Sequence, residues 1–142
     1  MNKEKLIREA INERCSLNLK KPTAKYLQFD AYDQNYIIEI KARKAFYEKQ
    51  IIEFSKFSFN SYYAKLNAKK FIYAVYINSD IYIFNISKLE ENNYNFEWEW
   101  RKLQSTTDFE NNDKILKFVG YISLKDSVKK ISNLTVNILL LV

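Results

Sequence analysis

Glycine and proline each occur only once in this chain of 142 residues, as Gly120 and Pro22. Such a chain cannot be collagen-like and contains no glycine-rich or proline-rich linker. The phosphate-binding loops GxGxxG and GxxxxGK[ST] need more than one glycine, so Rossmann and P-loop nucleotide sites are also excluded. Because the length suits one domain and we find no internal repeat, we expect residues 1–142 to form a single domain.

The absence of histidine narrows the chemistry further. Without histidine, His-ligated zinc sites and Ser-His triads are excluded. Cys15 is the only cysteine, which excludes cysteine metal clusters and an intrachain disulfide. Any catalysis must therefore use carboxylates, lysines, hydroxyls or amides. Binding a hard divalent cation is the obvious way to make carboxylates catalytic without histidine.

The net charge of +6 suggests a polyanionic partner, most often a nucleic acid. The charge is uneven: residues 1–71 hold fifteen basic and eight acidic side chains, and residues 72–142 hold eight and nine. Codon bias in an AT-rich genome is an equally simple source of these lysines. The longest apolar run is seven residues, at 71–77, and no signal peptide is recognisable, so we expect a cytoplasmic protein without membrane contact.

Hydrophobic periodicity predicts helices at residues 2–17 and 44–66. Strands are predicted at residues 25–32, 36–43, 71–77, 81–86 and 94–103. Residues 113–119 are a helix or a strand, 124–131 a short helix, and 134–142 an edge strand. The order α-β-β-α-β-β, followed by a mixed tail, predicts an α/β (α+β) fold with a mixed central sheet flanked by helices.

The two strands within residues 25–43 form a predicted hairpin around the turn Gln34-Asn35. This register places one apolar face on pairs of opposite residues, namely Phe29 with Ile40, Ala31 with Ile38 and Leu27 with Ala42. On the other face Asp30 lies opposite Glu39, with Lys41 two residues further along. Two carboxylates about 5 Å apart at Cβ repel each other, and a divalent cation between them reverses that effect.

At this point the sequence resembles the PD-(D/E)XK nuclease superfamily. The matching residues are Asp30 and, nine positions later, Glu39-Ile40-Lys41, in the α-β-β-α-β order of that family. Phe29 stands where the family name has proline. Residues 46–57 and 105–126 are also similar to the post-motif helix and the carboxy-terminal part of small phage-encoded members. The resemblance implies a restriction-endonuclease-like core.

The resemblance also implies a metal site and a reaction. Asp30, Glu39 and the main-chain carbonyl of Ile40 would hold Mg²⁺ or Mn²⁺, and Lys41 would orient the attacking water and stabilise negative charge. Members often add an acidic residue from the first helix, for which we favour Glu13, with Glu9 in reserve. The implied function is metal-dependent hydrolysis of DNA phosphodiester bonds, by an endonuclease or exonuclease encoded by a phage or mobile element.

Polar residues of the predicted second helix add to this site. Related nucleases place a glutamine or lysine from this helix near the metal, so we assign Gln50 a catalytic role and expect Lys56 nearby. Candidate contacts to DNA phosphates are Arg43, Lys44, Lys49, Lys56, Lys65, Lys69 and Lys70. Trp98 and Trp100 share one strand face, where we expect core packing, with base stacking as the alternative.

Two other functions remain open. A Holliday-junction resolvase would need a two-fold homodimer to cut symmetric strands. A catalytically silent nucleic-acid-binding or virion structural protein could keep the fold, although the presence of Asp30, Glu39 and Lys41 argues against it.

Overall fold

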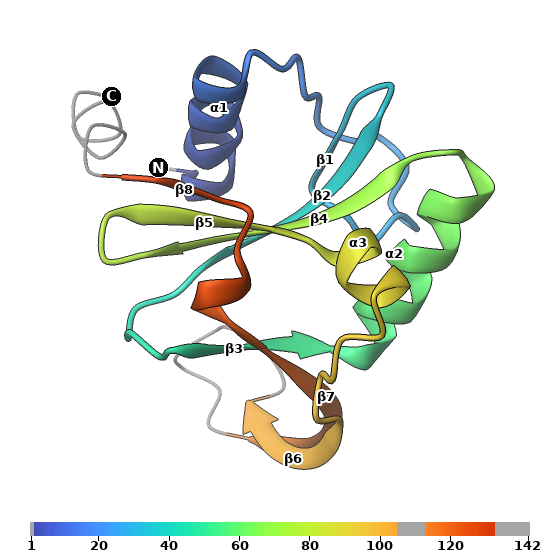
Figure 1. The fold of residues 1–142 in the computed structure, drawn as a ribbon, viewed down its shortest axis with the longest axis vertical. Coiled ribbons are helices and arrows are strands. Elements are labelled where there is room, and N and C mark those ends of the chain that lie inside the picture. Colours follow the sequence, from blue (N-terminus) through green and yellow to red (C-terminus); the bar gives the residue numbers. More distant parts are fainter. Residues whose placement is uncertain (1, 105–112, 133–142) are drawn as a thin grey trace.

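The computed structural model describes residues 2–104 and 113–132, which fold into two β-sheets and three α-helices (Figure 1). The larger sheet is mixed, with the strand order β1-β2-β4-β5-β8. β2 and β4 are parallel, and the other pairs are antiparallel. Its strands are β1 (Ala31–Tyr32), β2 (Tyr36–Ala42), β4 (Lys70–Ile77), β5 (Asp80–Asn85) and β8 (Lys129–Ile131).

Helix α1 (Lys3–Cys15) covers one face of this sheet (Figure 1) and confirms the helix predicted at residues 2–17. Its apolar stripe includes Ile7 and Ile11, which are buried against Ile38 of β2. The Asn2 side chain accepts a hydrogen bond from the Lys5 amide and so caps the first turn.

The parallel pair β2–β4 is connected through β3 (Lys49–Glu53) and α2 (Phe54–Leu66). The prediction of one helix over residues 44–66 is therefore wrong for residues 44–53, and so is the likeness of residues 46–53 to a helix. Ile51 and Ile52 are β-branched residues that favour a strand. β3 also pairs along its whole length with a strand near the carboxyl end of the chain, which a local pattern does not reveal.

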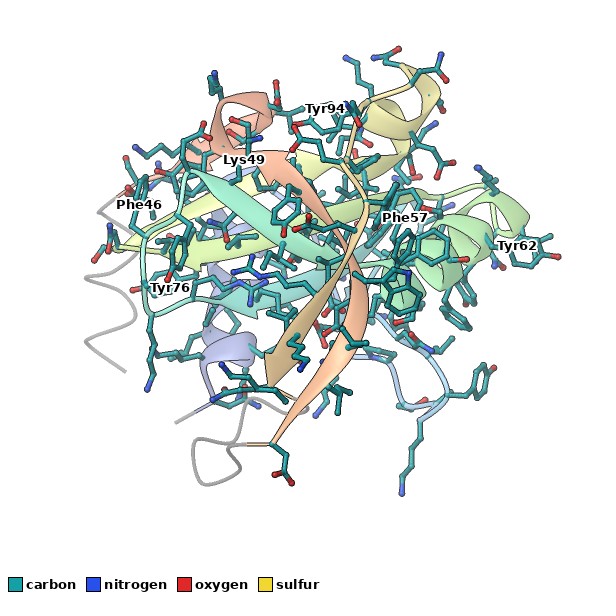
Figure 2. The ribbon with its side chains drawn as sticks, turned by 90° about the horizontal axis from the view of Figure 1, so that it is seen from below. Phe46, Lys49, Phe57, Tyr62, Tyr76 and Tyr94 are labelled. Carbon is teal, nitrogen blue, oxygen red and sulfur yellow. The ribbon has the colours of Figure 1, made fainter. Side chains whose placement is uncertain are left out.

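β3 belongs to a smaller antiparallel sheet with the order β3-β7-β6, which lies below the larger sheet in Figure 1 and faces the viewer in Figure 2. β7 (Lys114–Ser123) confirms the strand alternative for residues 113–119, and β6 (Glu99–Gln104) starts five residues later than predicted. Aromatic rings join this sheet to the start of α2: Phe54 and Phe57 pack against Trp98, with ring centroids 5.1 and 5.0 Å apart.

The remaining elements differ more from the predictions. The chain turns into a short helix, α3 (Ile86–Glu91), directly after β5. Residues 124–131 form a 3₁₀ turn (Leu124–Asp126) and then β8, so the predicted helix is wrong there. The predicted edge strand at 134–142 lies outside the described residues. Among the described residues, no helix is both long and apolar enough to cross a membrane.

We expect Gly120→Ala to destabilise the fold, because Gly120 allows β7 to approach Trp98. A Cβ added at this glycine would lie 2.8 Å from the Trp98 ring, closer than real side chains come. Overpacking of this kind costs about 1–3 kcal/mol, measurable by urea denaturation. Trp98→Ala should reduce the added cost of Gly120→Ala, and Lys114→Ala, on the exposed part of β7, should leave stability nearly unchanged. Equal costs of Gly120→Ala in both backgrounds would contradict this account.

Candidate active site

The predicted hairpin forms in the expected register but ends early. Ala31 is paired with Ile38, as predicted, and the Asp33 carboxylate accepts hydrogen bonds from the amides of Asn35 and Tyr36 and so fixes the turn. Going away from the turn, the pairing ends at Ala31, the first residue of β1. The carboxylate of Asp30 accepts a hydrogen bond from the Ile40 amide at 2.7 Å. It takes the place of a main-chain carbonyl of a longer β1.

Because the ladder ends there, the predicted pairs Phe29–Ile40 and Leu27–Ala42 do not form. Phe29 packs against Tyr63 of α2, whereas Ile40 is buried on the opposite face of the sheet, with Ile7 of α1. The amide of Asn60 donates to the Gln28 carbonyl at 3.2 Å and holds the chain just before Asp30. Asp30 is thus fixed at the edge of β2, between the two faces of the sheet.

Glu39 lies in the middle of β2, and only 2% of its surface is exposed. Its Oε1 atom accepts a hydrogen bond from Lys56 Nζ of α2 at 2.8 Å and lies 3.6 Å from Lys41 Nζ. Its Oε2 atom is buried and accepts no hydrogen bond from any residue that the structure describes. A buried carboxylate oxygen without a partner is costly, which makes this atom a candidate ligand for a cation.

The titration of Glu39 reflects this environment. Burial, and then the nearby Asp30 carboxylate, raise the pKa of Glu39 from 4.5 to about 7, against the opposing effect of Lys56 and Lys41. The carboxylates of Asp30 and Glu39 therefore lie close enough to repel each other, as the sequence predicted. Burial and the charge of Lys56 lower the pKa of Lys41, so the two lysines also interact.

The acidic side chain that α1 brings to Asp30 is Glu4. Burial and the charge of Asp30 raise the pKa of Glu4, and a side-chain hydrogen bond to Asp30 adds to the shift. Glu13 is exposed and nine residues further along α1, about 13 Å along the helix axis. The preference for Glu13 is therefore wrong, and Glu9 is exposed as well. The spacing of Glu4 from Ile7 and Ile11, at i+3 and i+7, is the sequence signal that could have found it.

A cleft of about 820 Å³ opens beside Glu39 and Lys41, between the two sheets. It is strongly basic, with six cationic side chains and two acidic ones among its lining residues. Glu53 belongs to it and accepts a hydrogen bond from Lys117 Nζ of β7 at 2.8 Å. The cationic side chains are Lys3, Lys41, Arg43, Lys44, Lys56 and Lys117.

Gln50 lies in β3 and not on a helix, so its predicted position is wrong. Its side chain is buried, its amide donates to the Tyr47 carbonyl, and it does not line the cleft. Arg43 does line the cleft, and it also connects the two sheets. Its guanidinium donates to the Ile51 carbonyl and to the Tyr73 hydroxyl, both at 3.1 Å.

The candidate phosphate contacts fall into two groups. Arg43, Lys44 and Lys56 line the cleft, and the other four lysines do not. Lys69 donates to the Asp33 carbonyl, at the end of the sheet away from Lys41. The remaining three are paired with glutamates: Lys49 with Glu97, Lys65 with Glu90 and Lys70 with Glu91.

The donor set fits a hard divalent ion with few protein ligands. Within residues 2–104 and 113–132, no group of three or more His, Cys, Asp or Glu side chains is arranged to hold a metal. Mg²⁺ usually keeps several waters and needs only one or two carboxylates. Asp30 and the Oε2 atom of Glu39 can supply these. The Ile40 carbonyl projects from the same strand edge as the amide that Asp30 accepts, beyond the end of β1.

Sequence reasoning missed two further residues of the cleft, Glu53 and Lys117. Glu53 was assigned to a helix, and nothing local in the sequence shows that β7 runs beside β3. The pKa of Glu53 is lowered, because the hydrogen bond from Lys117 and the charges of Lys117 and Lys41 outweigh the opposing effect of burial. These two residues connect the second sheet electrostatically to Lys41.

The opposite pKa shifts of Glu39 and Glu53 predict opposite effects of removing their charges. Because its pKa is raised, Glu39 contributes stability that is fully present below its unfolded pKa of 4.5 and is lost as the pH rises through about 7. In chelator, Glu39→Gln should therefore stabilise the protein at pH 8, by up to about 3 kcal/mol, with a smaller gain at pH 5.

Glu53→Gln is the matched control, since the contribution of Glu53 is present above its unfolded pKa and lost as the pH falls. It should destabilise the protein at pH 8. Urea unfolding of both variants at pH 5 and pH 8 measures the effect. A Glu39→Gln variant that loses stability at pH 8, as Glu53→Gln should, would contradict our view of this site.

The chain is similar to a known protein in its fold. No protein-family model and no curated protein sequence matches the chain. Among solved structures it is similar to Hjc, a Holliday junction resolvase from the archaeal hyperthermophile Archaeoglobus fulgidus. The TM-score is 0.50 and the identity 12%, over 92% of this chain and 98% of that chain. The chain therefore has the predicted fold class, a restriction-endonuclease-like α+β fold with a mixed central sheet flanked by helices.

Proposed function

We propose that this protein is a metal-dependent nuclease that hydrolyses phosphodiester bonds of DNA. The observation that carries the proposal is the buried Glu39 carboxylate, which lies beside Asp30 and Lys41 and opens onto a basic cleft. A carboxylate pair, a lysine and a cationic channel are the groups needed to bind a hard cation and a phosphodiester together. The similarity in fold to a Holliday junction resolvase supports the same reaction class.

In this proposal Asp30, Glu39 and the Ile40 carbonyl hold Mg²⁺ or Mn²⁺, with Glu4 in the place that we had assigned to Glu13. When bound, the ion supplies positive charge for the phosphate and lowers the pKa of a water molecule. The chain contributes the fixed position of the ligands. Asp30 is held by two hydrogen bonds to β2, one through its carboxylate to the Ile40 amide and one from its own amide to the Ile38 carbonyl.

Lys41 is the residue that we assign to the reacting phosphate. Its ammonium group lies 3.6 Å from Glu39 and is held there before any substrate arrives, so it costs little reorganisation to stabilise developing negative charge. Lys56 favours the ionised form of Glu39, because its ammonium group donates directly to that carboxylate. Arg43, Lys44 and Lys117 line the same cleft and would contact the DNA backbone.

A Holliday-junction resolvase is the second candidate, and the similarity to Hjc favours it. Such an enzyme must cut two strands symmetrically, which needs a two-fold homodimer. Comparing cleavage of a four-way junction with cleavage of the same arms as linear duplexes separates this candidate from a general nuclease.

The first test concerns metal binding without turnover. Millimolar Mg²⁺ or Mn²⁺ should raise the melting temperature, because an ion that binds only the folded state stabilises it by mass action. Asp30→Asn should abolish the increase, and Glu13→Gln, at the exposed position on α1, should retain it. If neither ion changes the melting temperature of the wild-type protein, the protein does not have this metal site.

The second test concerns catalysis. Purified protein with Mg²⁺ or Mn²⁺ should cleave duplex, single-stranded or branched DNA, and chelator should stop the cleavage. Lys41→Ala should lower turnover by about a hundredfold or more. It should bind DNA nearly as tightly as the wild type, because the remaining cations of the cleft supply most of that affinity.

Two double variants serve as controls for the binding surface. Lys44→Ala with Lys117→Ala should weaken DNA binding and flatten its salt dependence, whereas Lys65→Ala with Lys69→Ala, away from the cleft, should change both much less. A wild type that binds DNA but cuts no substrate with either metal would favour the silent binding protein. Absence of both binding and cleavage would leave codon bias as the reason for the lysines.

A further inference from the structure

The hairpin formed by β6 and β7 carries an exposed face that the proposed reaction does not use. Side chains alternate along each strand, and Trp100 is paired with Phe118, Lys102 with Leu116, and Gln104 with Lys114. These six residues therefore share one side of the hairpin, which we call the outer face. All of them except Phe118 are exposed.

Trp100 is the main feature of the outer face, with 67% of its surface exposed. Its ring centroid lies 5.1 Å from that of Phe118, which in turn packs against Trp98 and Phe54. One side of the indole is thus supported by the aromatic cluster that joins the second sheet to α2. The remainder is an apolar surface of fixed orientation.

The charge of the outer face indicates what it can bind. Lys102 follows Trp100 on β6 and is paired with Leu116, and Lys114 lies next to Leu116 on β7. The six residues include no acidic side chain. Leu116 is 60% exposed. An exposed aromatic ring beside lysines suits a single strand of nucleic acid, because the bases stack on the ring while the lysines contact the phosphates.

The outer face meets the basic cleft at one residue, Gln104. Gln104 belongs to it and also lines the cleft, together with Leu103 of the same strand and Lys117 of β7. DNA with a phosphate at Glu39 and Lys41 would leave the cleft past Gln104 and meet Lys102 and Trp100 next. This path rests on the proposed function, which places the substrate in the cleft.

We propose that the outer face of the β6–β7 hairpin binds a single-stranded segment of the DNA substrate, with Trp100 stacking on an unpaired base. Substrates with unpaired bases next to the cleavage point are then preferred to continuous duplex, because paired bases are not free to stack on the ring. Trp100 is in this view a specificity residue that does not touch the reacting phosphate.

The test measures binding in chelator, so that no cleavage takes place. Fluorescence anisotropy compares a labelled single strand, a forked duplex and a continuous duplex. Trp100→Ala should weaken binding of the single strand and the fork roughly 5-fold or more and change duplex binding less than about 2-fold, while Trp100→Phe retains most of the affinity. Lys102→Ala with Lys114→Ala should lower the salt dependence of single-strand binding.

Tyr62→Ala is the matched control. Tyr62 is an exposed aromatic residue, 66% accessible, which projects from α2 away from the hairpin (Figure 2). Its removal should leave all three affinities unchanged. Sedimentation of the wild type and of Trp100→Ala tests whether this face is instead a contact between two copies of the chain. A dimer that Trp100→Ala dissociates would overturn the proposal.

The results separate this proposal from the nuclease proposal. If the protein cleaves DNA but Trp100→Ala binds all three probes as the wild type does, the outer face has no role and the nuclease stands. If single-strand binding depends on Trp100 but no metal supports cleavage, the proposal for the outer face is supported and the nuclease proposal is contradicted. A wild type that binds none of the probes, or a Trp100→Ala variant that loses duplex and single strand equally, overturns the stacking role.

Discussion

The burial of one carboxylate, that of Glu39, is the constraint on which the structure of the site depends. A charge inside a sheet is expensive unless opposite charges and hydrogen bonds meet it. Lys41 can reach it only from the same face of β2, and Lys56 only because the chain crosses from β2 to β4 through β3 and α2. Both lysines lie against the Oε1 atom of Glu39, and its Oε2 atom has no hydrogen-bond partner among the described residues.

The edge of the sheet supplies the second half of the site. β1 has only two paired residues, and the Asp30 carboxylate replaces the next main-chain partner of β2. The same hydrogen bond therefore ends the ladder and fixes the acid that approaches Glu39. A longer β1 would pair the edge of β2 through its main chain and move the Asp30 carboxylate away from it. The shortness of this edge strand is thus part of the site and not a defect of the sheet.

The sequence predicts what local interactions decide. The turn at Gln34-Asn35 sets the hairpin register, so the spacing predicts that Asp30 lies near Glu39, and the hydrogen bond from the Ile40 amide fixes the Asp30 carboxylate. Gln50 could not be placed in the same way, because β3 is a strand only by pairing with β7, some seventy residues later. Glu13 was preferred from a helical wheel, which shows the face of a helix but not which of its ends meets the sheet edge. Glu4 lies at the end that does.

In the proposed function, the second sheet carries residues for DNA binding, and the large sheet carries those for the reaction. Glu39 and Lys41 lie on the large sheet, whereas Lys117 and Trp100 lie on β7 and β6. Beside the cleft, Arg43 and Tyr73 join the two sheets by donating hydrogen bonds to the Ile51 carbonyl of β3. Under the two proposals, substitutions in the hairpin would therefore alter which DNA is bound without moving the proposed metal ligands. The only glycine of the chain has its place in the same arrangement. Because Gly120 has no side chain, Trp98 packs directly on β7, and the aromatic cluster that supports Trp100 can form.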